Sequence, residues 1–171
     1  MKQRDTYFQV TYGRLKLREW WLEGQESLVT VRRGGHLEAG NEVGSAGATL
    51  IAYTRANEVI SRMSDYLVSP VPEPETLRLM LAETLGILVV VEKVRVLYTY
   101  GSTRIHLDTV QGLGTFVELE TVIGEATSLM DAMAEHQAVI TALGLDVLPP
   151  VATSYSDLLI SAEGEASAWE D

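Results

Sequence analysis

Five short stretches of this chain alternate between charged and apolar residues. They are residues 13–19 (GRLKLRE), 50–55 (LIAYTR), 92–96 (EKVRV), 104–108 (RIHLD) and 116–120 (FVELE). Side chains on a β-strand point to opposite faces with period two, so each stretch predicts a strand with one charged and one apolar face. A sheet of such strands must cover its apolar side and enclose water or a ligand on its charged side, as a barrel or tunnel does.

The rest of the pattern predicts the order of the elements. Strands are expected over residues 6–10, 14–21, 49–55, 59–66, 88–100, 103–110 and 115–122, with hairpin turns at 101–102 and 112–114. Helices are expected over residues 75–85 and about 126–143, each closed by a glycine (Gly86 and Gly144), with one more helical turn at 154–159. This order indicates an α+β fold on an antiparallel sheet, with the two helices on its apolar side and with Met80, Met130 and Met133 in the core.

Composition narrows the class of protein. We expect one domain over residues 1–160 with a glycine-rich insertion at 19–48, followed by an acidic, flexible tail at 161–171. No apolar run approaches the ~20 residues of a membrane helix and residues 1–6 carry no signal-peptide core, so we expect a cytoplasmic protein without a membrane partner. The absence of cysteine excludes disulfides, thiolate nucleophiles and cysteine-ligated zinc. A net charge of -11 argues against nucleic acid as a partner.

The basic residues are concentrated in the alternating stretches. Seven basic side chains and three carboxylates fall on the charged faces: Arg14, Lys16, Arg18, Arg55, Lys93, Arg95 and Arg104 against Asp108, Glu118 and Glu120. The seven basic residues are more than half of the 13 Lys and Arg of the chain. One such strand alone is typical of a solvated surface, but five of them favour a shared positive site for a small phosphorylated or otherwise anionic ligand.

These stretches, in this order, resemble the CYTH superfamily, which contains class IV adenylyl cyclases, thiamine triphosphatases and inorganic triphosphatases (triphosphate tunnel metalloenzymes). The resemblance runs from about residue 5 to residue 159 and includes residues 112–120 (GLGTFVELE) and 154–159 (SYSDLL). It implies an eight-stranded antiparallel tunnel with helices outside. Its basic residues would grip a triphosphate and its acidic residues would hold Mg²⁺ or Mn²⁺.

Carried over by position, the resemblance implies roles for individual residues. Phosphate-binding roles fall to Arg18, Arg55, Lys93 and Arg95, with Lys16 and Arg104 as further candidates, and catalytic roles to Lys93 and Arg95. Metal-binding roles fall to Glu118 and Glu120, with Asp108 as a ligand or a support for one. His106 shares the face of Arg104 and Asp108, where it is interpreted as a structural hydrogen-bonding residue or, alternatively, a general base.

Two departures from the family pattern leave the function open. No Glu-x-Glu-x-Lys strand occurs, so the first family strand is missing from the predicted sheet, and the insertion, with an extra strand expected at residues 27–33, could supply Glu38 or Glu42 instead. The open sheet edge makes a homodimer a prediction. We expect metal-dependent binding and turnover of a triphosphate compound, by a cyclase or a triphosphatase. The alternative is a repurposed or non-catalytic barrel that binds an anionic small molecule; the charged alternation disfavours a lipocalin-like carrier of apolar ligands.

Overall fold

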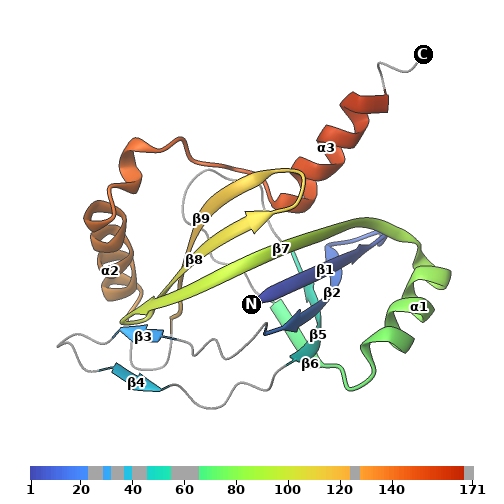
Figure 1. Ribbon diagram of the computed structural model, residues 1–171, viewed down its shortest axis with the longest axis horizontal. Helices are drawn as coiled ribbons and strands as arrows, with labels where there is room; N and C mark the ends of the chain where they lie inside the picture. The colour runs from blue at the N-terminus through green and yellow to red at the C-terminus, as the bar shows by residue number, and fades with distance from the viewer. Residues whose placement is uncertain (23–28, 32–36, 40–45, 55–65, 124–127, 168–171) are drawn as a thin grey trace.

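The computed structural model describes residues 1–22, 29–31, 37–39, 46–54, 66–123 and 128–167. Its strands are β1 (Lys2–Phe8), β2 (Arg14–Trp21), β3 (Val29–Val31), β4 (Leu37–Ala39), β5 (Ala46–Tyr53), β6 (Tyr66–Pro70), β7 (Ile87–Tyr100), β8 (Thr103–Val110) and β9 (Gly114–Thr121). Its helices are α1 (Pro74–Leu85), α2 (Leu129–Ala142) and α3 (Tyr155–Ser167), with a short 3₁₀ turn at Leu145–Val147. The α+β fold predicted from the sequence is confirmed (Figure 1).

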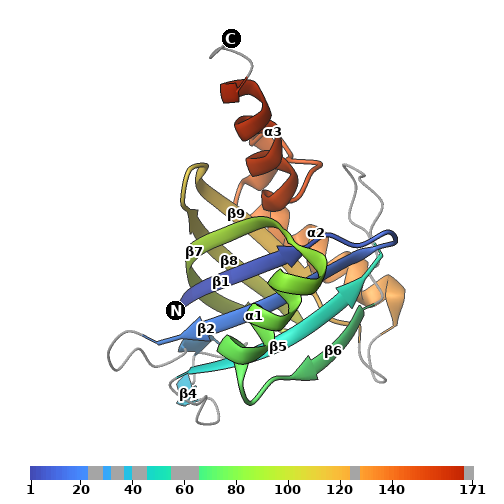
Figure 2. The ribbon, with the colours of Figure 1, turned by 90° about the vertical axis from the view of Figure 1, so that its right-hand side faces the viewer.

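Seven of these strands form one antiparallel sheet in the order β6-β5-β2-β1-β7-β8-β9, while β3 and β4 pair separately. β1 lies at the centre, between β2 and β7. Figure 2 shows the sheet curving, with β6 and β9 at its two rims. Within the described residues these rims do not pair with each other, so the sheet is not closed into a barrel.

The outer, convex face of the sheet carries α1 and the main apolar core. Phe8, Leu17 and Ala48 are buried there, and the apolar side of α1 packs on them through Leu77, Leu81 and Leu85. The helix ends where expected, because Gly86 adopts φ 77° and its N–H reaches back to the carbonyl of Ala82. This core holds β1, β2 and β5 in place, so that their opposite faces can carry polar groups.

Helix α2 lies at one end of the same outer face. Its first residue is set by Ser128, whose hydroxyl accepts the N–H of Asp131 as an N-cap. Glu135 then accepts hydrogen bonds from the N–H of Ser102 and the hydroxyl of Thr103, at the β7–β8 turn. Two helices on the apolar side were expected and are found.

The prediction of a buried position for the helix methionines is wrong. Met80, Met130 and Met133 are 60%, 80% and 62% exposed. The outer face of β7–β9 is also only partly covered, since Val96, Leu107 and other apolar residues there remain about half exposed. An apolar residue on a helix is buried only if a second element faces it, and the periodicity of one helix does not reveal that element.

Helix α3 packs on the other side of the sheet. Its residues Tyr155 and Leu159 contact a buried cluster of Tyr7, Val89, Val91 and Val110 on the concave face. The helix continues to Ser167, well past the single turn expected at residues 154–159. It therefore covers one end of the concave face.

Two of the expected strands fall only partly within the described residues. The strand expected over residues 59–66 lies almost wholly outside the described residues, and β6 begins at its last residue, Tyr66. The extra strand expected at residues 27–33 is described only as β3, Val29–Val31. Both hairpin turns form as expected, with positive φ at Gly101, Gly112 and Gly114.

Candidate functional site

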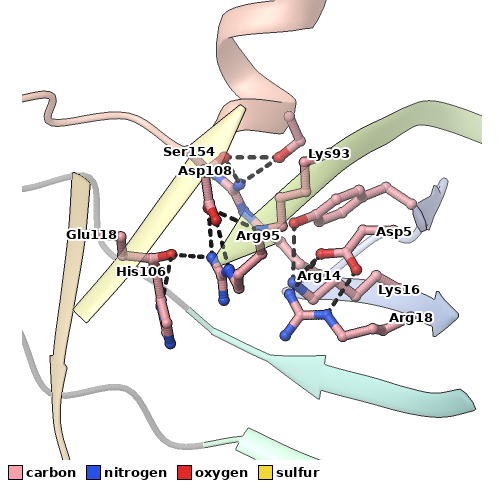
Figure 3. A network of polar contacts seen from close by, with 12 residues as sticks. Asp5, Arg14, Lys16, Arg18, Lys93, Arg95, His106, Asp108, Glu118 and Ser154 are labelled. Atoms are coloured by element: carbon pink, nitrogen blue, oxygen red, sulfur yellow. Dashed lines mark hydrogen bonds and ion pairs between the residues drawn. The ribbon is translucent and has the colours of Figure 1, made fainter. Parts of the chain in front are cut away.

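The register of the sheet brings the charged side chains to one face. Arg18 lies directly opposite Asp5, Arg95 opposite Asp108, and His106 opposite Glu118. Residues directly opposite each other in an antiparallel pair share a face. We call this concave side the inner face. It also carries Lys16 and Lys93 (Figure 3), and the strand register places Arg104 on the same face.

The first group on this face is the Asp5 cluster, consisting of Asp5, Lys16 and Arg18. Arg18 donates from Nε to Oδ1 of Asp5 at 2.8 Å and from Nη2 to Oδ2 at 2.7 Å, and Lys16 donates to Oδ2 at 2.9 Å. The Asp5 side chain is 3% exposed. Burial by itself would raise the pKa of Asp5, but Lys16 and Arg18 together hold that pKa far below its usual range. The carboxylate is therefore ionised, with two cations fixed around it.

The second group is the Asp108 cluster, consisting of Lys93, Arg95, Asp108 and Glu118. Arg95 makes a bidentate pair with Asp108, from Nε to Oδ1 at 2.7 Å and from Nη2 to Oδ2 at 2.6 Å. Lys93 donates to Oδ2 of Asp108 at 3.2 Å, and Nη2 of Arg95 also reaches Oε2 of Glu118 at 2.6 Å. The Asp108 side chain is fully buried, whereas that of Glu118 is 47% exposed. This cluster therefore has one closed and one open carboxylate.

The pKa of Lys93 is strongly lowered in the site. Burial lowers its pKa first, and the neighbouring charge of Arg95 lowers it further, so that even beside Asp108 the pKa of Lys93 falls to about 8. Its ammonium group lies 5.1 Å from the ring centre of Tyr155, the first residue of α3. That ring in turn packs on Phe116, at 4.9 Å between centroids. Helix α3 therefore contributes an aromatic ring to the surroundings of Lys93.

Arg14 contacts the start of α3 and stands apart from both clusters. Its guanidinium donates to the hydroxyls of Ser154 and Ser156 at 2.7 and 3.2 Å and to Asp157 at 2.9 Å. Ser154 and Asp157 also bond reciprocally, each accepting the backbone N–H of the other at 3.3 Å, which caps the helix. Arg14, counted among the basic groups from its alternation alone, has its guanidinium hydrogen bonds directed to this helix.

The remaining candidate residues either lie beside the two clusters, belong to the separate two-stranded sheet or fall outside the described residues. Arg104 pairs with Glu120 at 3.2 Å, and both side chains are largely exposed, at 49% and 37%. His106 is buried, with Nδ1 3.5 Å from Oε2 of Glu118. Arg55 and Glu42 lie outside the described residues, and Glu38 belongs to β4 in the separate two-stranded sheet.

Sequence reasoning missed two important members of the site. Asp5 was not selected, because its strand, Lys2–Phe8, is polar at nearly every position and shows no alternation of charged and apolar residues. Tyr155 was matched as part of a motif, but its position beside Lys93 depends on how α3 crosses the sheet. No period-two pattern of polar and apolar residues marks Asp5 in the sequence of β1.

Glu118 is the carboxylate best placed to hold a metal ion. Both oxygens of Asp108 already accept hydrogen bonds from Arg95, whereas the contacts of Glu118 with Arg95 and His106 use Oε2. In the described part of the chain no three His, Asp or Glu side chains gather as a ready metal site. Mg²⁺ commonly takes one or two carboxylates and completes its shell with waters and substrate phosphates, so a half-exposed Glu118 fits such an ion.

Comparison with known proteins identifies the family of the chain. The family model for the CYTH domain matches residues 1–155, so the chain belongs to the CYTH domain family, whose members form triphosphate-binding tunnels and generally depend on a metal ion. No curated protein matches the chain. None of the helices in the described residues has the length and hydropathy to span a membrane.

Solved structures from Pyrococcus share the fold. The PH1819 protein of Pyrococcus horikoshii OT3 superposes with a TM-score of 0.65 at 20% identity, over 94% of this chain and 84% of that one. A conserved hypothetical protein of Pyrococcus furiosus gives 0.64 at 20% identity, over 92% and 82%. The PH1012 protein of P. horikoshii OT3 gives 0.63 at 17% identity, over 92% and 81%.

Proposed function

We propose that the inner face binds a triphosphate compound together with Mg²⁺ or Mn²⁺ and turns it over. The observation that carries this proposal is the convergence of Lys16, Arg18, Lys93 and Arg95 on one concave face of a CYTH-family sheet. A triphosphate carries several negative charges in a row, and a set of fixed cations in a partly buried place is the arrangement that such a ligand requires.

The two buried aspartates support binding by fixing the arginines. In the contacts of Arg18 with Asp5, and of Arg95 with Asp108, the guanidinium uses its Nε and Nη2 groups. Such a side-on pair holds the plane of the guanidinium and leaves its Nη1 edge to donate elsewhere. Figure 3 shows the Arg18 guanidinium extending toward the side of the network where Arg95 and Glu118 lie. Phosphate oxygens between the clusters would meet both edges.

The metal ion would be held by Glu118, with Glu120 as the next carboxylate along the same face of β9. Asp108 then holds Arg95, which contacts Glu118, and so acts as an indirect support for a metal ligand, one of the two roles that the resemblance implies for it. When bound, the ion would neutralise phosphate charge and polarise the phosphoryl group. Arg95 contacts Glu118 directly, so the same guanidinium can hold both the carboxylate and a phosphate oxygen.

The chemistry would be supplied mainly by charge and position. In the hydrolase version, a water oxygen bonds to the terminal phosphorus, and the bridging P–O bond breaks with its electron pair on the diphosphate. One proton of the water passes to an oxygen of the diphosphate that leaves. In the cyclase version, the 3′-hydroxyl oxygen of ATP bonds to the α-phosphorus, and pyrophosphate leaves with the electron pair and the hydroxyl proton. Lys93 and Arg95 would stabilise the charge that develops on the phosphoryl oxygens in either case.

A non-catalytic barrel that binds an anionic small molecule is the second candidate. It is favoured by the contacts of Asp108, because both of its oxygens already accept hydrogen bonds from Arg95 rather than serving only as ligands for a metal ion. It predicts affinity for phosphates that does not depend on a metal ion. The two candidates share the binding site and differ in turnover.

Calorimetric titration of tripolyphosphate and of ATP, with and without Mg²⁺ or Mn²⁺ and followed by product analysis, tests the proposal. We expect metal-strengthened binding with release of phosphate or pyrophosphate, and a loss of affinity of about 100-fold or more in Arg95→Ala. The matched control is Arg4→Ala, which removes an arginine paired with Glu92 on the opposite face of the sheet. Equal affinity of Arg95→Ala and the wild type would contradict the proposed site, and binding without product would select the non-catalytic candidate.

A further inference from the structure

Gln3 is an uncharged side chain placed between the two charged clusters. It lies on the inner face of β1, with Trp20 of β2 and Lys93 of β7 directly opposite it on either side. Asp5 follows it on the same face of β1, and Arg95 follows Lys93 on the same face of β7. Gln3 on β1 therefore lies on the diagonal that runs across the sheet from Arg18 on β2 to Arg95 on β7.

The amide of Gln3 is buried and incompletely satisfied. The residue is 6% exposed, and within the described part of the chain its Oε1 has no hydrogen-bond partner. A buried carbonyl oxygen without a donor costs stability, so such groups in a folded protein are few and point to a missing partner. The nearby cations have carboxylate partners, as Arg18 does in Asp5 and Arg95 in Asp108. A donor that arrives with the ligand would satisfy Oε1.

The chemistry of Oε1 restricts what that group can be. An amide oxygen only accepts hydrogen bonds, and the oxygens of an ionised triphosphate also only accept them. A phosphate chain lying between Arg18 and Arg95 therefore cannot satisfy Gln3. Among the groups that the proposed reaction brings to the inner face, the nucleophile carries an O–H that can donate to Oε1.

We propose that Gln3 orients the nucleophile of phosphoryl transfer by accepting a hydrogen bond from its O–H, an inference that rests on the proposed function. An oxygen held in this way directs a lone pair at the phosphorus, and a bound glutamine can position an attacking water without acting as a base. The O–P bond forms and the bridging P–O bond breaks as described above. The released proton goes to the leaving phosphate or pyrophosphate, since an amide does not take it up.

The test is the variant Gln3→Leu, which is similar in size and lacks the amide. We expect kcat to fall about 100-fold while the calorimetric affinity for tripolyphosphate and the KM stay within about twofold. The melting temperature should not fall, because the substitution removes an unsatisfied buried group. The matched control is Gln111→Leu, an exposed glutamine in the β8–β9 turn, which should leave kcat unchanged.

Each other outcome overturns the assignment in a distinguishable way. Unchanged kcat in Gln3→Leu, in a wild-type protein that turns over, removes the role of Gln3 and leaves the proposed function intact. A loss of tripolyphosphate affinity at unchanged kcat means that the amide binds phosphate, and a loss confined to the KM of ATP means that it reads the organic group. A wild-type protein that gives no product overturns the proposed function and the role of Gln3 with it.

Discussion

The Asp5 cluster and the Asp108 cluster are built from similar parts and differ in balance and in access to water. The first combines one carboxylate with Lys16 and Arg18, which are 11% and 23% exposed, and carries a net positive charge. The second combines two carboxylates with two cations that are 3% and 7% exposed, and it is neutral as a whole. The comparison shows that one half of the site is suited to attract an anion. The other half holds buried charges in balance, and Glu118 is its open member.

The largest expected effect is the loss of the buried carboxylate of Asp108. Asp108→Asn leaves Lys93 without its hydrogen-bonded carboxylate and Arg95 with Glu118 alone, and we expect the free energy of unfolding to fall by about 3–5 kcal/mol. Asp5→Asn should cost less, about 2 kcal/mol, because Lys16 and Arg18 can turn toward water. Urea unfolding of both variants at pH 7 measures the difference. Equal losses would mean that the two clusters are equally enclosed.

The second prediction concerns the pH dependence of stability, in which the Asp108 cluster should respond at alkaline pH through Lys93. Lys93 gives up its proton at about pH 8 in the folded protein but at about 10.5 in the unfolded chain. Between these values the unfolded state binds more protons, so the free energy of unfolding should rise with pH, by about 3 kcal/mol over the whole interval. Urea unfolding from pH 7.5 to 10.5 should show this rise in the wild type and lose it in Lys93→Met. A rise of the same size in both proteins would assign it to other groups.

The Asp5 cluster should respond at the opposite end of the scale. The pKa of Asp5 is lowered, so its ion pairs add stability above the ordinary carboxyl pKa of 3.8 and lose it as the pH falls below that value.

The third prediction concerns the metal ion. Glu118→Gln keeps the shape of the side chain and removes the charge, so Mg²⁺ or Mn²⁺ should no longer strengthen tripolyphosphate binding, a loss of about tenfold or more. Glu92→Gln, on the outer face and paired with Arg4, is the control and should retain the metal effect. Calorimetry with and without the ion decides, and a metal effect retained in Glu118→Gln would move the metal site elsewhere.

The smallest effect on stability is expected for the exposed pair of Arg104 and Glu120. Arg104 and Glu120 are both exposed, so Arg104→Ala should lower the free energy of unfolding by less than about 1 kcal/mol. Its effect on tripolyphosphate affinity should also be well below that of Arg95→Ala. A loss of affinity equal to that of Arg95→Ala would extend the binding site to the outer part of β8 and β9.

Much of the fold follows from local pattern. Strands such as Arg14–Trp21 and Thr103–Val110 alternate clearly and lie between turn residues, so their bounds and faces were predictable. The faces of Lys93 and Arg95 could likewise be predicted from the period of two. The burial of Met130 could not be judged, because it depends on whether another element covers α2.

The partners within the site were beyond the sequence for a similar reason. Alternation places Arg95 and Asp108 on charged faces, but only the register of β7 against β8 makes them direct neighbours. Register also makes Asp5 the partner of Arg18, and the path of α3 sets Tyr155 beside Lys93. These relations join distant parts of the chain and have no local signature.

The contacts of Arg14 with α3 have a consequence for how the chain folds. They join residues 140 to 143 positions apart, so the entropic cost of closing that long loop must be met before they contribute any stability. Contacts of this range slow folding, and the sheet must exist before α3 has a surface on which to dock. During synthesis, Arg14 leaves the ribosome long before Ser154 and Asp157. The end of the inner face beside Lys93 is therefore completed last, after all the strands of the sheet have been made.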